Sequence, residues 1–160
     1  MKEKYKKIKM LIMDVDGTLT DGKIYIGASG EEFKAFNVKD GYGIKLLKLN
    51  GIIPAIITGR NSEFVLRRAE ELGIEEVFQG IENKLQKYEE LKMKYDLIDD
   101  EIAYIGDDIN DYEILKKVGA KFAVANCVRN LKTIVDYVSV LNGGDGAVRE
   151  IIDLILSNDI

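Results

Sequence analysis

Acidic residues gather at two places in this chain, each directly after a short apolar run. The five that follow such runs are Asp14, Asp16, Asp107, Asp108 and Asp111. Two carboxylates one residue apart repel each other unless a cation lies between them. Carboxylate, carbonyl and water oxygens are the ligands that Mg²⁺ prefers in proteins. The two acidic clusters therefore predict a magnesium site, and the string D-V-D-G-T-L-T at 14–20 is a far more specific signal than D-x-D alone.

A hydroxyl and a lysine after two further apolar runs could bind the oxygens of a phosphoryl group. Thr58 and Gly59 follow the run at 53–57, where free backbone N–H groups beside a helix start would favour an anion. Lys84 follows the short run at 76–78 and could supply a positive charge. Because ligands bind at the carboxyl ends of the strands in an open parallel sheet, we expect these residues and the acidic clusters to line one crevice.

The composition excludes several other kinds of chemistry. The 160 residues include no histidine and a single cysteine, Cys127, which excludes Ser-His-Asp hydrolysis, imidazole-ligated metals and thiolate-rich zinc sites. The net charge of −5 argues against a nucleic-acid surface, which needs clustered Lys and Arg. No apolar run approaches the roughly 18 residues of a membrane span, and no apolar run typical of a signal peptide (an h-region) precedes Asp14. We therefore expect a cytoplasmic protein that binds neither nucleic acid nor membranes.

Short apolar runs alternate with amphipathic stretches, which is typical of parallel strands and their crossover helices. The strands that we predict are at 8–14, 53–57, 76–78, 102–106, 121–125 and 137–140. The helices that we predict are at 41–50, 62–72, 83–95, 111–118 and 146–157. A chain of this length supports one core. Residues 1–160 are therefore predicted to form a single α/β domain with a doubly wound, mostly parallel sheet.

One segment interrupts this alternation. Residues 23–26 and 32–36 read as two strands around the turn 27–30, which predicts a β-hairpin inserted after the first strand. The hairpin carries Tyr25, Phe33 and Phe36. It could therefore cover the core of its own subunit or that of a neighbour.

At these positions the chain resembles the haloacid dehalogenase superfamily of phosphatases. The four motifs of that superfamily match, in order and spacing, 14–20, Thr58, Lys84 and 106–111. Four further strings resemble one branch, the 3-deoxy-D-manno-octulosonate 8-phosphate phosphatases: F-N-V-K-D-G-Y-G-I at 36–44, T-G-R-N-S at 58–62, F-Q-G at 78–80 and G-G-D-G-A-V-R-E at 143–150. Members of that branch lack a separate cap domain and are typically tetramers. The resemblance thus implies a Rossmann-like α/β fold and a homotetramer with hairpin-mediated contacts.

The resemblance also implies roles for the residues that react and bind magnesium. Asp14 is the expected nucleophile, which becomes transiently phosphorylated. Asp16 is expected to protonate the departing sugar oxygen and then to act as the base for water. The Asp14 carboxylate, the Asp16 main-chain carbonyl and the Asp107 carboxylate are the expected magnesium ligands.

Four more residues acquire supporting roles through the same resemblance. Thr58 and Lys84 are expected to bind the transferring phosphoryl oxygens, and Asp108 and Asp111 to orient waters or Lys84. A loose phosphoryl-transfer transition state needs alignment and charge neutralisation above all, which agrees with this division of labour.

The sugar-acid end of the substrate needs a cation for its carboxylate. Lys39, Arg60 and Arg149 are the candidate cations, and Gly59 is a further residue that is expected to bind the substrate. Related phosphatases of nine-carbon keto-acid 9-phosphates often carry an acidic residue at the position of Arg60, so the arginine favours the eight-carbon substrate. The family builds the lid of a capless site from the hairpin and C-terminal tail of adjacent subunits.

Two alternatives belong to other functional classes. A response-regulator receiver domain also has an acidic magnesium pocket with a Thr and a Lys, but its acidic pair follows strand one and its phosphoacceptor follows strand three. Here the second acidic cluster follows the fourth strand, and Thr58 precedes Lys84. The other alternative is a catalytically silent homologue that serves oligomerisation or binding, which the intact acids, Thr58 and Lys84 argue against.

Overall fold

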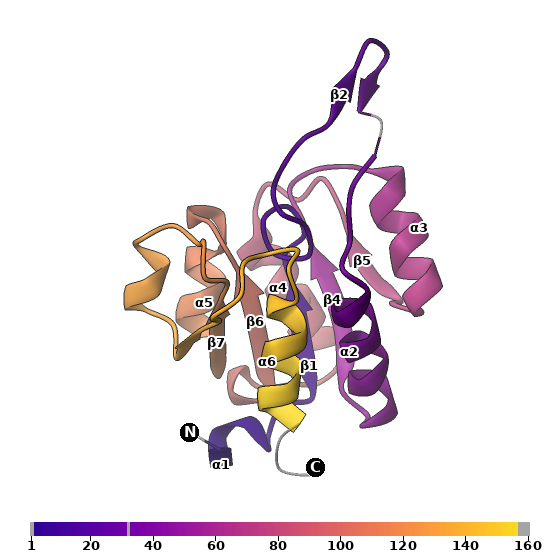
Figure 1. Cartoon of the computed structure of the whole chain (residues 1–160). Coiled ribbons are helices and arrows are strands. Elements are labelled where there is room, and N and C mark those ends of the chain that lie inside the picture. Colours follow the sequence, from indigo (N-terminus) through magenta and orange to yellow (C-terminus); the bar gives the residue numbers. More distant parts are fainter. Residues whose placement is uncertain (1, 32, 157–160) are drawn as a thin grey trace.

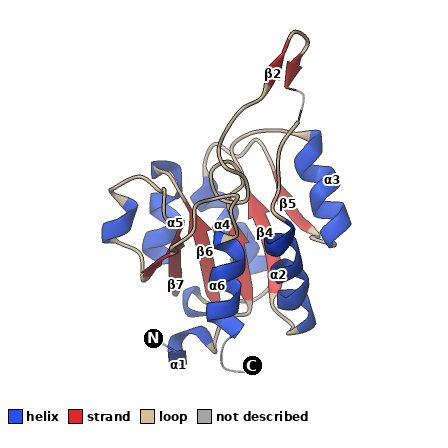
Figure 2. Ribbon diagram, viewed as in Figure 1, coloured by secondary structure: helices blue, strands red, loops and turns tan. Residues whose placement is uncertain are grey.

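Six parallel strands form the main sheet, and helices cover both of its faces (Figures 1 and 2). The structure, a computed structural model, describes residues 2–31 and 33–156. The strands of this sheet are β1 (Met10–Met13), β4 (Ile53–Ile57), β5 (Glu76–Phe78), β6 (Ile102–Gly106), β7 (Ala120–Ala123) and β8 (Tyr137–Val138). Their order is β5-β4-β1-β6-β7-β8, and each neighbouring pair is parallel. The strand order reverses between β1 and β6, which is the switch point where open α/β sheets bind ligands.

The helices pack as two layers. They are α1 (Lys2–Tyr5), α2 (Val38–Leu49), α3 (Glu63–Leu72), α4 (Lys84–Lys94), α5 (Tyr112–Lys117) and α6 (Ala147–Leu156), with 3₁₀ turns at Asp99–Glu101, Ile109–Asp111 and Leu131–Thr133. Helix α2 contacts α6 and α3, whereas α4 contacts α5, and Figure 1 shows α2 and α6 in front of the sheet with α4 behind it. All four residues of β1 are buried, because a strand covered on both faces must be apolar throughout.

The predicted strands and helices of the main sheet are confirmed, with shifts of a few residues at their ends. The largest shift is in α2, which begins at Val38 rather than at residue 41 because Asn37 caps it: the Lys39 N–H donates to Asn37 Oδ1 at 2.9 Å. Residue 157, the end of the last predicted helix, lies outside the described residues. Among the helices of residues 2–31 and 33–156, none is long and apolar enough to cross a membrane.

The inserted hairpin is present, but its paired strands are much shorter than predicted. Only β2 (Ile26–Gly27) and β3 (Gly30–Glu31) pair. Of the predicted arms 23–26 and 32–36, Ile26 is in a strand, residues 23–25 and 33–36 are not, and residue 32 is not described. The hairpin projects from the body of the protein (Figure 1), and Ile26 is 76% exposed at its tip.

Candidate active site

The loops that follow β1 and β6 meet at the switch point of the sheet. Met13 pairs in register with Ile105, so Asp14 and Asp107 emerge at the same carboxyl edge. The Asp14 N–H donates to the Ile105 carbonyl at 3.1 Å, and Thr18 Oγ1 lies 3.3 Å from Asp107 Oδ1, to which it donates. These bonds join the two predicted acidic clusters into one site.

Two glycines allow this close approach. Gly17 has φ +96°, and a Cβ built on it would lie 2.1 Å from Asp107 Oδ2. A Cβ on Gly106 would lie 2.2 Å from Asp111 Oδ2. A side chain at either position would displace one of these carboxylates, and at Gly17 the positive φ disfavours a side chain as well.

Lys84 is the cation at the centre of the site. Its Nζ lies 2.6 Å from Asp14 Oδ1 and 2.7 Å from Asp111 Oδ1, and the side chain is 2% exposed. Burial alone would lower the pKa of Lys84, but the two carboxylates outweigh burial and raise that pKa. Lys84 is therefore a fixed positive charge at the first turn of α4.

Asp111 is fully buried and uses both of its carboxylate oxygens. Oδ1 accepts from Lys84 and from the Tyr104 hydroxyl at 2.6 Å, and Oδ2 accepts from the backbone N–H groups of Asp107 at 3.0 Å and Asp108 at 3.3 Å. Sequence reasoning missed Tyr104. Its signal was a tyrosine inside an apolar strand, because a buried phenol needs a hydrogen-bond partner. Burial and the neighbouring carboxylates raise the pKa of Tyr104, so it stays a donor.

Three carboxylates crowd this site with one lysine to balance them. One oxygen each of Asp14, Asp107 and Asp111 lies within 4.8 Å of the others. Burial, followed by repulsion from Asp111, raises the pKa of Asp14 well above its usual range and that of Asp107 to about 6. One ammonium cannot neutralise three carboxylates, so a further cation would be stabilised here. Because the oxygens of Asp111 are already bonded, Asp14 and Asp107 are the carboxylates left to hold it.

The other two predicted acids lie at the rim of this cluster. The Asp16 carboxylate is paired with Lys34 rather than with Lys84, and no described residue donates to the Asp16 main-chain carbonyl, which leaves that oxygen open to a cation. Asp108 is exposed, and its side chain accepts from the Ile109 N–H at 2.6 Å as a helix cap. The all-oxygen donor set of Asp14, Asp107 and the Asp16 carbonyl fits Mg²⁺.

Thr58 lies one residue beyond β4 and is 1% exposed. Since Met13 pairs with Ile56, Thr58 extends one residue further past the sheet edge than Asp14. Its N–H donates to the Phe78 carbonyl at 2.9 Å, and its carbonyl accepts from Ile81 at 3.0 Å, which fixes the loop. Gly59 beside it is exposed.

The three predicted cations for the sugar acid do not contact the acidic cluster in the described part of the chain. Lys39 is exposed in the first turn of α2, and Arg60 is exposed after Gly59. Arg149 Nε donates to Asp153 at 2.7 Å, and its guanidinium lies 5.5 Å from the centroid of the Tyr42 ring. Their substrate contacts remain a prediction.

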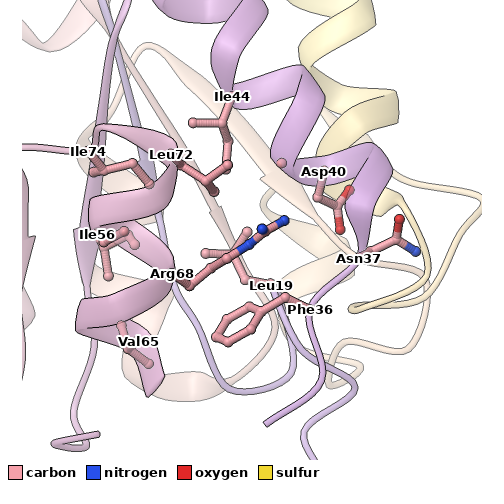
Figure 3. A pocket seen from close by; sticks show the side chains of 12 residues that line it. Leu19, Phe36, Asn37, Asp40, Ile44, Ile56, Val65, Arg68, Leu72 and Ile74 are labelled. Atoms are coloured by element: carbon pink, nitrogen blue, oxygen red, sulfur yellow. The ribbon is translucent and has the colours of Figure 1, made fainter. Parts of the chain in front are cut away.

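A separate pocket between α2 and α3 contains a buried carboxylate. Figure 3 shows Arg68 of α3 reaching across this pocket toward Asp40. Asp40 Oδ1 accepts from the Arg149 N–H at 2.8 Å, whereas Oδ2 is buried with no partner among the described residues. The pocket holds about 10 Å³ of free space, room for about one water molecule. Burial raises the pKa of Asp40 to about 6, although the Arg149 N–H and Arg68 oppose this.

We expect Asp40→Asn to stabilise the fold above about pH 6 but not below about pH 4. Below the unfolded pKa of 3.8 the carboxyl is protonated in both states. As the pH rises to about 6 and above, the folded parent must ionise a buried carboxyl. Its free energy of unfolding therefore falls by up to about 3 kcal/mol, whereas that of the Asp40→Asn variant does not. Urea unfolding of both proteins across this range measures the difference. A difference in the free energy of unfolding between the two proteins that stays constant with pH would contradict this prediction.

Part of the site lies within a region that matches known hydrolases. A family profile described as haloacid dehalogenase-like hydrolase matches residues 76–151, which include Lys84 and Asp107. The 3-deoxy-D-manno-octulosonate 8-phosphate phosphatase KdsC of Escherichia coli K12 is 47% identical over 153 residues, which are 96% of this chain and 81% of that protein.

Solved structures agree with this similarity. The 3-deoxy-D-manno-octulosonate 8-phosphate phosphatase of Yersinia pestis matches with a TM-score of 0.95 at 46% identity, over 98% of this chain and 84% of that one. The Moraxella catarrhalis phosphatase of the same name matches with a TM-score of 0.95 at 45% identity, over 98% of this chain and 90% of that one. That structure is a complex with a magnesium ion, a phosphate ion and a KDO molecule. The predicted α/β fold of the haloacid dehalogenase phosphatases is thereby confirmed.

Proposed function

Because this chain belongs to the haloacid dehalogenase-like hydrolases, in the branch of the 3-deoxy-D-manno-octulosonate 8-phosphate phosphatases, we propose that it hydrolyses that sugar-acid phosphate through a phosphorylated Asp14. The observation that carries the proposal is the Asp14 carboxylate itself. It is buried at the switch point of the sheet, bonded to Lys84 and crowded by Asp107 and Asp111. Such a carboxylate is poised for a cation and a phosphate rather than for solvent.

In the proposed first step, an Asp14 carboxylate oxygen forms a bond to phosphorus while the bond from phosphorus to the sugar oxygen breaks. Asp16 gives a proton to the departing oxygen, and then takes one from the water that cleaves the aspartyl phosphate. Mg²⁺, held by Asp14, Asp107 and the Asp16 carbonyl, would neutralise charge on the phosphoryl oxygens and align them with Asp14. Holding the reactants in line accounts for much of the rate of such reactions.

The neighbouring residues would align the phosphoryl group and the reacting carboxylate. Thr58 and Gly59 would donate to the phosphoryl oxygens, and Lys84 would balance their charge. Asp111 holds Lys84 in place, and Asp108 would order the turn after β6 and the water around it.

We propose that the sugar-acid end is bound with help from adjacent subunits of a homotetramer. Lys39, Arg60 and Arg149 are the proposed cations for the carboxylate. The projecting hairpin, with Ile24 and Ile26 exposed at 47% and 76%, would supply contacts between subunits. Residues 1–160 would act as one domain, and one continuous core supports this. The cytoplasm remains the proposed location.

The substrate assignment is tested with a panel of phosphates in Mg²⁺. We expect 3-deoxy-D-manno-octulosonate 8-phosphate to give the highest kcat/KM, ahead of the nine-carbon keto-acid 9-phosphate and of a sugar phosphate without a carboxylate. The advantage in kcat/KM over the sugar phosphate without a carboxylate should be about 10-fold or more, which one charge-assisted contact supplies. Equal rates on all three would contradict the assignment, and a higher rate on the nine-carbon ester would favour that alternative.

A further inference from the structure

Lys34 lies where the returning arm of the hairpin passes the loop after β1. Its side chain is 3% exposed, and its ammonium pairs with Asp16 Oδ1. The second carboxylate oxygen of Asp16, Oδ2, is also buried but has no partner among the described residues. A buried polar atom without a partner is costly and is uncommon away from functional sites. One carboxylate oxygen of Asp16 is therefore bonded to Lys34, and the other is buried without a partner among the described residues.

We propose that Lys34 is a positioning residue for the proton transfer: it fixes Asp16 through Oδ1 so that Oδ2 is the atom that faces the sugar oxygen. The inference rests on the proposed role of Asp16 as acid and base. An ammonium offers only donors, so a proton carried by Asp16 cannot sit between Oδ1 and Lys34. The proton passes from Oδ2 to the departing oxygen, and Oδ2 later takes one from water.

The hairpin determines where Lys34 lies. Backbone pairing between the two arms ends at Ile26 and Glu31, before the chain returns to Lys34. Next to Lys34, the Phe33 ring stacks on the Tyr25 ring of the other arm, with centroids 4.6 Å apart. This stack joins the arms at the point where the backbone ladder has ended. The hairpin thus acts on the site of its own chain through Lys34, besides any role between subunits.

If Lys34 positions Asp16, the loss of rate in a Lys34 variant should depend on the leaving group of the substrate. A sugar alkoxide leaves slowly unless it is protonated, whereas p-nitrophenolate leaves as an anion. Loss of a general acid lowers rates by about 10²–10⁴-fold. We expect Lys34→Met to lower kcat on 3-deoxy-D-manno-octulosonate 8-phosphate by about 10²-fold, with a loss at least about 10-fold smaller on p-nitrophenyl phosphate. A general disturbance of Asp14 or of the metal site would lower both rates alike.

Three further variants control this experiment. Lys23→Met makes the same change on the outgoing arm, where Lys23 is exposed and pairs with Asp21 at 3.1 Å, and both rates should be unchanged. Lys34→Arg keeps the charge and should restore part of the sugar-phosphate rate. Phe33→Ala removes an exposed ring of the stack and should produce a smaller loss with the same dependence on the leaving group.

A double-mutant cycle with Asp16→Asn decides whether Lys34 acts through Asp16. If it does, Lys34→Met should slow the Asp16→Asn enzyme less than about 3-fold, because the proton donor is already absent. Equal losses on both phosphates, or an undiminished loss in the Asp16→Asn background, would overturn the inference. If Lys34→Met does not fold, Lys34→Arg and Phe33→Ala decide it by the same ratio of rates. Failure of the proposed function would look different, because the parent enzyme itself would then not hydrolyse 3-deoxy-D-manno-octulosonate 8-phosphate.

Discussion

Asparagine in place of Asp14 is expected to abolish phosphate release from every substrate, by at least about 10⁴-fold, and to leave the fold intact. An amide cannot attack phosphorus, and p-nitrophenyl phosphate does not bypass this requirement because it needs the same nucleophile. The amide oxygen can still accept from Lys84, whose second partner, Asp111, remains. Burial already disfavours a charge on Asp14, so its removal should cost little stability. Initial rates on both substrates, with circular dichroism and thermal unfolding, measure these effects.

The Asp16→Asn variant is the matched comparison for this result. It should lose about 10²–10⁴-fold on sugar phosphates and much less on p-nitrophenyl phosphate. An Asp14→Asn enzyme that keeps more than about one hundredth of the parent rate would contradict the assignment of the nucleophile. So would a phosphoryl group recovered on any other residue of the parent after acid quenching.

Removal of Mg²⁺ is expected to reduce the rate to background and to lower the stability of the fold. Without a cation, Asp14 and Asp107 repel each other and Asp111, and burial together with Asp111 raises the pKa of Asp107 to about 6. A divalent ion that binds only the folded protein stabilises it by about 2.7 kcal/mol at 100 times its dissociation constant. Activity should stop in EDTA and return with added Mg²⁺. The thermal midpoint should rise with Mg²⁺ whether or not substrate is present.

Two variants that each remove one negative charge distinguish Mg²⁺ binding at this site from a general effect of charge. Asp107→Asn should lose both the activity and the Mg²⁺-dependent rise in the midpoint. Glu113→Gln changes an exposed acid two residues after Asp111 and should keep both. An enzyme that works equally well in EDTA, or a midpoint that rises with Mg²⁺ in Asp107→Asn, would refute the proposed metal ligands.

The residues at the carboxyl edge of the sheet could be predicted because the sequence patterns that mark them are local. Apolar runs that end in Asp14, Thr58 and Asp107 mark strands, and parallel strands bring their carboxyl ends to one edge. The contact of Lys84 with Asp14 links positions 70 residues apart, yet it too follows from topology. For this reason the fold, and the grouping of the acids with Lys84, emerge from the pattern alone.

Residues whose importance depends on an individual long-range contact could not be predicted. Lys34 reads as an ordinary charge on a polar hairpin, and only the path of the returning arm brings it to Asp16. Tyr104 reads as one more strand residue until its hydroxyl is seen to bond Asp111. Asp40 reads as an acid in the first turn of a helix, and its burial results from the packing of α6 and α3 around α2.

The length of the paired strands in the hairpin was overestimated. The sequence predicts strands at 23–26 and 32–36, but backbone pairing ends at Ile26 and Glu31. Pairing survives at two positions near the tip, and the Tyr25–Phe33 stack replaces it below.

The most direct test of the central claim is a crystal structure determined with Mg²⁺ and phosphate. We predict one octahedral ion bound by the carboxylates of Asp14 and Asp107 and the main-chain carbonyl of Asp16, with ligand distances of about 2.1 Å and a phosphate oxygen among its ligands. A structure of the active enzyme in which these carboxylates point apart, or in which the ion is bound elsewhere, would contradict the account.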